Sequence, residues 1–109
     1  MAATLKQHWY YILLAIAGGP RHGLAIARDV RESSGGRVRL WPATLYGSLE
    51  GLLDRGWIEE IAEPSRRPDS SERKRYYGLT RTGRAVLDAE TDRLAALVKL
   101  ARQARKQPS

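Results

Sequence analysis

Apolar residues recur every three or four positions in the first part of the chain, the spacing that places them on one face of an α-helix. The first predicted helix has a broad apolar face, and the glycines and proline at 18–20 end it. A second predicted helix spans about residues 22–33 and has a narrower apolar stripe. The apolar positions are Leu5, Trp9, Ile12, Leu13 and Ile16 in the first helix, and Leu24, Ala27 and Val30 in the second.

The middle of the chain combines a short alternating segment with a third helix. Charged and apolar residues alternate over residues 37–40, which predicts a short, half-buried strand. A helix at about residues 42–55 follows, because proline suits a first helical position and Gly56 suits the C-terminal stop. Its predicted core stripe consists of Leu45, Leu49, Leu52 and Leu53.

The second half of the chain predicts a β-hairpin and then a long helix. Strands are expected at residues 57–62 and 73–79, with residues 63–72 as a projecting loop that is too long for a tight turn. Thr80 is a suitable cap for a helix from residue 81 to about residue 103. We therefore expect a mainly α fold with a small β-hairpin (α+β), in which residues 1–80 form a winged helix-turn-helix. Residues 81–105 would form a C-terminal dimerisation helix, and residues 106–109 a disordered tail.

Composition favours a nucleic-acid partner. The chain has 109 residues and a formal net charge of +7, which suits double-stranded DNA, although solubility alone also explains a basic balance. The absence of cysteine excludes disulfides and thiolate zinc sites, and we expect neither a metal nor a cofactor. No apolar run reaches the roughly 20 residues that span a bilayer, and no signal peptide is recognised. We therefore expect no membrane association and a cytoplasmic location.

The third predicted helix is the candidate DNA-reading element. Its leucines occupy one face, and small residues occupy the opposite face, which would enter a major groove about 12 Å wide. Each mid-helix glycine costs roughly 0.5–1 kcal/mol relative to alanine, so two glycines on one face indicate close approach of another backbone. Packing against the first or second helix is the alternative. The candidate DNA-binding positions here are Thr44, Tyr46, Gly47, Ser48 and Gly51.

Basic residues in and beside the hairpin loop form a candidate wing that would lie along phosphates or reach the minor groove. An ordinary solvated hairpin with charged edges is the alternative. The candidate wing positions are Arg66, Arg67, Arg73, Lys74 and Arg75, and Arg39 on the short predicted strand is a further candidate DNA contact.

The sequence does not predict an enzyme. His8 and His22 have no cysteine or paired carboxylate at the spacing of a metal site or a catalytic dyad, and His22 is expected to cap the second helix or lie on the polar surface. Glu59 and Glu60 are neighbours on a predicted strand and therefore point to opposite faces. A winged-helix module that binds proteins and not DNA is the alternative function.

These segments resemble the PadR family of transcription regulators, in its short form with a single C-terminal helix. The resemblance extends over about residues 5–100. It rests on the motifs YILL at 11–14, GPRHG at 19–23, ATLYGSLEGL at 43–52, GWI at 56–58 and RYYGLTRTG at 75–83. Two features depart from the family pattern. Glycines stand at 47 and 51, and the last helix lacks the aromatic residues that hold flat ligands in some members.

The resemblance implies a homodimer on palindromic operator DNA, usually a repressor that a small aromatic effector releases. The last helix would pack on the first helix of the partner subunit. The dimerisation residues would then be Leu5, Trp9, Ile12, Val86, Leu87, Glu90, Leu94, Leu97, Val98 and Ala101. Trp9 and Tyr10 are candidate effector residues, with plain core packing as the alternative.

Overall fold

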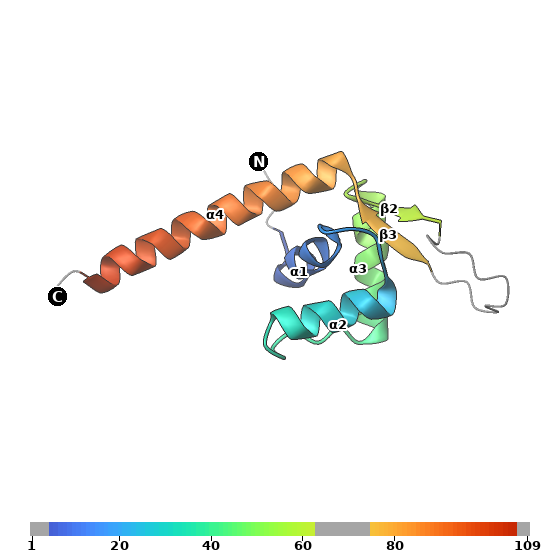
Figure 1. Ribbon diagram of the computed structural model, residues 1–109, viewed down its shortest axis with the longest axis horizontal. Helices are drawn as coiled ribbons and strands as arrows, with labels where there is room; N and C mark the ends of the chain where they lie inside the picture. Colours follow the sequence, from blue (N-terminus) through green and yellow to red (C-terminus); the bar gives the residue numbers. More distant parts are fainter. Residues whose placement is uncertain (1–4, 63–74, 107–109) are drawn as a thin grey trace.

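The computed structural model describes residues 5–62 and 75–106, which form four helices and a small sheet (Figure 1). The helices form where the hydrophobic periodicity predicts them, so the mainly α fold with a small β component is confirmed. The elements, in chain order, are α1 (Gln7–Ile16), β1 (Arg21–His22), α2 (Gly23–Ser33), α3 (Pro42–Asp54), β2 (Ile58–Ile61), β3 (Tyr76–Leu79) and α4 (Arg81–Lys106).

The sheet is antiparallel, with β3 in the centre and the strand order β1-β3-β2. The hairpin strands β2 and β3 pair Ile58 with Leu79 at one end and Ile61 with Tyr76 at the other. The third strand, β1, is only two residues long and pairs His22 with Tyr76. It precedes α2 directly, and His22 caps that helix by accepting a hydrogen bond from the Ala25 backbone N–H at 3.2 Å.

The strand predicted at residues 37–40 is absent, and the third strand lies at β1 instead. After α2 the chain turns through Gly35 and Gly36, which have φ values of +64° and +81°. The hydroxyl of Ser34 then accepts a hydrogen bond from the Val38 backbone N–H at 2.9 Å. These local bonds hold the segment as an irregular loop between α2 and α3, and the alternation of charged and apolar residues reflects only which side chains face the core.

A single hydrophobic core lies where α1 meets α2, α3, α4 and the sheet. Its fully buried side chains each contribute roughly 1.5–3 kcal/mol on burial. The predicted stripe of α2 is wrong at one position, because Leu24 is 70% exposed and Ile26 is buried in its place. The largest buried side chains are Ile12, Leu13, Ile16, Ile26, Val30, Leu45, Leu49, Leu52 and Ile58.

Helix α4 is anchored to this body at its first turns and then extends away from it (Figure 1). Thr80 caps the helix, because its hydroxyl accepts from the Gly83 N–H at 3.0 Å and donates to the Gly56 carbonyl at 2.6 Å. Arg84 adds a hydrogen bond to the Ala17 carbonyl at 2.8 Å. Only Gly83 and Leu87 are buried among its 26 residues, so most of the helix projects from the body as a free arm. Among the described helices, none is both long and apolar enough to cross a membrane.

Candidate nucleic-acid interface

Helix α3 has one buried face and one exposed face. Leu45, Leu49 and Leu52 point into the core, and Pro42 occupies the start of the helix as predicted. Thr44 and Gly47 are exposed, as are the acidic residues Glu50 and Asp54 further along the helix. The exposed face therefore carries small side chains in its N-terminal half and negative charge near its C-terminal end. Because acidic residues repel phosphate, the N-terminal half is the part of this face that could approach DNA.

Two predicted members of this face lie elsewhere. Ser48 is only 5% exposed and lies on the core side of α3. Gly51 packs beneath Trp9 of α1, since a Cβ at this position would lie 2.9 and 3.0 Å from the Cζ2 and Cη2 atoms of the indole. The prediction that both residues lie on the exposed face is wrong, because α3 is rotated so that each meets the core.

Gly47 differs from Gly51 in this respect. A Cβ at Gly47 would meet no atom within 4 Å, and the residue does not have a positive φ angle. Neither packing nor backbone conformation within the described residues therefore requires glycine at this position. The helix nevertheless forgoes the roughly 0.5–1 kcal/mol that alanine would supply at an exposed helical site.

Tyr46 connects α3 to the start of α2. A Cβ on Gly23 would lie 3.4 Å from both Cε1 and Oη of Tyr46, so the ring covers this glycine and keeps the two helices close. Half of the Tyr46 side chain remains exposed, which leaves an edge of the ring at the surface beside the exposed face of α3.

Most of the predicted wing, namely Arg66, Arg67, Arg73 and Lys74, lies outside the described residues. Arg75 is described, and it is exposed beside Glu60 of β2, with 3.6 Å between its Nε and the carboxylate. The neighbouring Tyr77 is buried, and its burial together with the charge of Glu60 raises the pKa of the phenol. Arg75 is thus a surface cation that one carboxylate partly neutralises.

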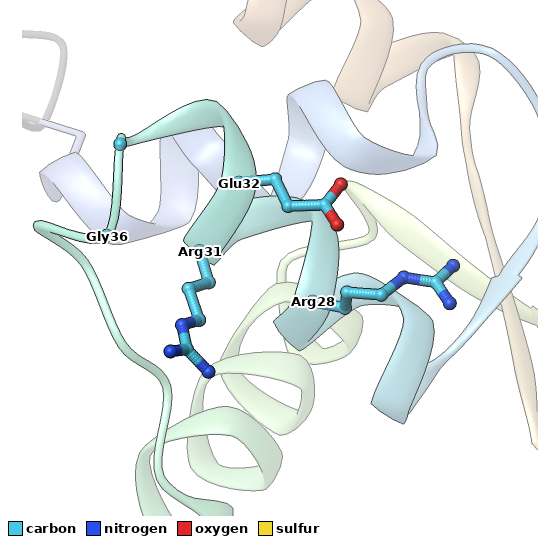
Figure 2. Close-up of a pocket in the computed structure, with 5 residues that line it drawn as sticks. Arg28, Arg31, Glu32 and Gly36 are labelled. Carbon is cyan, nitrogen blue, oxygen red and sulfur yellow. The ribbon is translucent and has the colours of Figure 1, made fainter.

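The side of the molecule beside the start of α3 carries arginines and an exposed indole. Arg28 and Arg31 project from α2 in different directions, and Figure 2 shows Glu32 pointing away from Arg31. These three residues, with Gly35 and Gly36, line a hollow of about 410 Å³. A second hollow, of about 250 Å³, is lined by Ala27, Arg28, Arg31, Arg39, Leu40 and Trp41.

Sequence reasoning missed Trp41 and Arg31. Trp41 occupies the N-cap of α3, makes no side-chain cap and is 67% exposed. A tryptophan where helices prefer Ser, Thr, Asp or Asn was the available signal. Arg39, which was predicted as a DNA contact, is exposed on this same side.

The predicted dimerisation residues divide into a buried and an exposed group. Trp9, Ile12 and Leu87 belong to the core of one chain and offer no surface to a partner, which corrects their assignment. Leu5, Val86, Glu90 and Leu94 are half-buried. The other predicted members, Leu97, Val98 and Ala101, are exposed, and so is the neighbouring Leu100.

The two candidate effector residues lie in different surroundings. Trp9 packs against Trp57 in a T-shaped pair with ring centroids 6.1 Å apart, and the guanidinium of Arg55 lies 4.8 Å from its ring, so it is a core residue. Tyr10 bridges α1 and α4 through a 2.9 Å hydrogen bond between its hydroxyl and that of Thr91. It also lines a cavity of about 450 Å³ together with Leu5, Gln7, Tyr11, Glu90, Arg93 and Leu94.

Known structures share this fold. A PadR family transcription regulator from Clostridium difficile R20291 has a TM-score of 0.75 at 23% identity, covering 90% of this chain and 97% of that one. The structure of Bacillus subtilis PadR in complex with operator DNA has a TM-score of 0.68 at 23% identity, covering 79% of this chain and 47% of that one.

The sequence comparisons identify the family. An uncharacterized 37.1 kDa protein in transposon TN4556 of Streptomyces fradiae is 35% identical over 86 residues, which are 79% of this chain but 22% of that protein. The model of the transcriptional regulator PadR-like family matches residues 12–89. Its members regulate transcription and are not enzymes, as the sequence predicted. The chain belongs to the PadR-like family of transcriptional regulators.

Proposed function

We propose that the protein binds double-stranded DNA as a homodimer and regulates transcription by inserting the N-terminal half of α3 into the major groove. Gly47 carries this proposal, because no contact among the described residues requires glycine at this position, whereas glycine suits close approach to a DNA backbone or base edge. The net charge of +7 supports the same partner, because phosphate contacts supply most of the affinity of such proteins. The PadR of Bacillus subtilis, with which this chain shares its fold, is described in complex with operator DNA.

The homodimer would bring two copies of α3 to successive major grooves. Those grooves lie about 34–36 Å apart on one face of B-DNA, and the two-fold symmetry of the dimer would make the operator palindromic. The exposed apolar residues Leu97, Val98 and Leu100 of α4 would supply the dimer contact. Repression would follow if the operator overlaps a promoter.

Release by a small aromatic effector is the last part of the proposal. The cavity between α1 and α4 has a volume of about 450 Å³ and is lined by the aromatic rings of Tyr10 and Tyr11. A ligand there would alter how α4 sits on the body and hence the distance between the two reading helices.

Fluorescence anisotropy with labelled duplexes from the region upstream of the protein's own gene tests DNA binding. Gly47→Gln adds a side chain on the approach face and should abolish specific binding. Ala85→Gln, an exposed helical position on α4, is the matched control and should bind as the wild type does. Equal binding by the two variants would overturn the placement of α3 in the groove. Failure of the wild-type dimer to bind any duplex would favour the protein-interaction alternative.

A further inference from the structure

A groove beside the start of α3 has features that neither the fold nor the core explains. Its walls are Ala27, Arg28 and Arg31 of α2, and Arg39, Leu40 and Trp41 of the segment that leads into α3. It encloses about 250 Å³. This volume suits a phosphate group with its adjoining sugar better than a whole aromatic drug.

The charges on the groove are only partly neutralised. Arg28 lies 3.8 Å from the carboxylate of Asp29, which Arg21 also approaches at 3.4 Å. Within residues 5–62 and 75–106, Arg31 and Arg39 form no ion pair. Two guanidinium groups that have no ion pair with any described residue, with the carboxylate of Glu32 directed away from Arg31 in Figure 2, are complementary to an anion.

Trp41 adds an apolar surface to the same groove. Its side chain is 67% exposed and neither caps α3 nor belongs to the core. Of the three tryptophans, Trp9 is buried and Trp57 is half-buried, so Trp41 alone presents most of its indole at the surface. An occupant with both an anionic part and an apolar part would satisfy the arginines and this ring together.

The position of the groove indicates which occupant this is. Trp41 immediately precedes Pro42, so the groove adjoins the exposed N-terminal half of α3 that carries Thr44 and Gly47. A helix in the major groove lies between two sugar-phosphate backbones. The β2–β3 hairpin follows the C-terminal end of α3, whereas the loop between α2 and α3 leads into its N-terminal end (Figure 1). This groove therefore lies at the end of α3 that the hairpin strands do not reach.

We propose that this groove binds the sugar-phosphate backbone of the DNA strand that flanks α3 on its α2 side. Arg31 and Arg39 pair with one phosphate, and the indole of Trp41 packs against the adjoining deoxyribose. This inference rests on the proposed DNA binding and adds to it a second, sequence-independent anchor that fixes the register of α3.

The salt dependence of binding tests the arginines. The variant Arg31→Gln with Arg39→Gln should weaken binding at least tenfold at fixed salt, the size of a charge-assisted hydrogen bond of roughly 1.4 kcal/mol. It should also reduce the magnitude of the negative slope of log K against log salt by about 1.8, which is about 0.9 for the one phosphate contact that each of the two subunits loses. The loss should be the same on specific and mixed-sequence duplexes. The matched control is Arg102→Gln with Arg105→Gln, which removes equal charge from the exposed far end of α4.

Trp41 provides a direct optical readout. Iodide should quench the tryptophan emission of the free protein mainly through Trp41, and a bound duplex should protect that emission. Trp41→Ala should remove the protectable component and weaken binding without a change in the salt slope, because no charge is lost. Circular dichroism of each variant should match that of the wild type, since all the altered side chains are exposed.

The possible failures are distinguishable. If the wild type binds duplex DNA but the double-arginine variant behaves as its control does, or if DNA leaves Trp41 open to iodide, the groove is not a backbone site and the proposed function stands. If the wild type binds no duplex, the proposed function fails as well.

Discussion

Replacing Gly47 or Gly51 of α3 by alanine should show by the change in stability which of the two glycines the packing of the helix requires. Gly47→Ala adds a methyl group that meets nothing within 4 Å, so the helix gains the intrinsic advantage of alanine. The free energy of unfolding should rise by about 0.5–1 kcal/mol.

Gly51→Ala should act in the opposite direction. Its methyl group would lie 2.9 Å from Cζ2 of Trp9, and that indole is held by Trp57 and by the guanidinium of Arg55. Overpacking of a core costs typically about 1–3 kcal/mol, which exceeds the gain in helix propensity. The net result should be a loss of about 1 kcal/mol in unfolding free energy.

Urea unfolding followed by circular dichroism measures both changes. Protein concentration must be equal in every sample, because dimer formation couples to stability. The slope against urea should be unchanged, so the shift in midpoint reports the change in stability. The same Gly47→Ala protein should bind duplex DNA more weakly although it is more stable. A Gly47→Ala variant less stable than the wild type would refute the reasoning, and so would a Gly51→Ala variant stabilised as much as Gly47→Ala.

Three further predictions concern the cap of α4, the pH response and assembly. Thr80→Ala removes the cap on the Gly83 N–H and should lower the unfolding free energy by about 1 kcal/mol in urea titrations, whereas an unchanged midpoint would show that the cap is dispensable. Burial and Lys6 lower the pKa of His8 below 6.5, so its stabilising contribution is complete above pH 6.5 and is lost as pH falls. The urea midpoint should therefore decrease less between about pH 7.5 and about pH 5.5 for His8→Gln than for the wild type. An equal decrease in the two proteins would contradict this assignment. Leu97→Asp should shift the mass measured by light scattering from about twice 12.2 kDa towards 12.2 kDa, while an unchanged mass would place the dimer contact elsewhere.

Hydrophobic periodicity was sufficient to predict the four helices and the two strands of the hairpin, but not the third strand of the sheet. Helices of 10 residues or more carry several turns of apolar spacing, which identifies them independently of their surroundings. Residues 37–40 alternate over too short a span to distinguish a strand from a loop. The actual third strand, Arg21–His22, has only two residues, and it exists because Tyr76 and Tyr77 lie beside it in the fold.

The candidate site shows the same limit at the level of single residues. Gly47 and Gly51 are four positions apart and therefore differ by only about 40° around the helix, so their sequence spacing alone could not separate them. The position of Trp9 separates them, and that position depends on the packing of α1. Apolar spacing likewise identified Trp9, Ile12 and Leu87 as residues to be covered. It did not show that they cover one another within a single chain.

The attachment of α4 at Gly83 makes the helix a lever. A Cβ at Gly83 would collide with the Trp57 carbonyl, so this turn lies directly against the backbone of the body and fixes the fulcrum. From Gly83 to Lys106 the helix extends about 35 Å, at 1.5 Å per residue. A rotation of about 5° at the fulcrum would therefore displace the far end by about 3 Å. A slight rearrangement at the α1–α4 contact, where Tyr10 meets Thr91, would be amplified along the arm into a change that a distant subunit can sense.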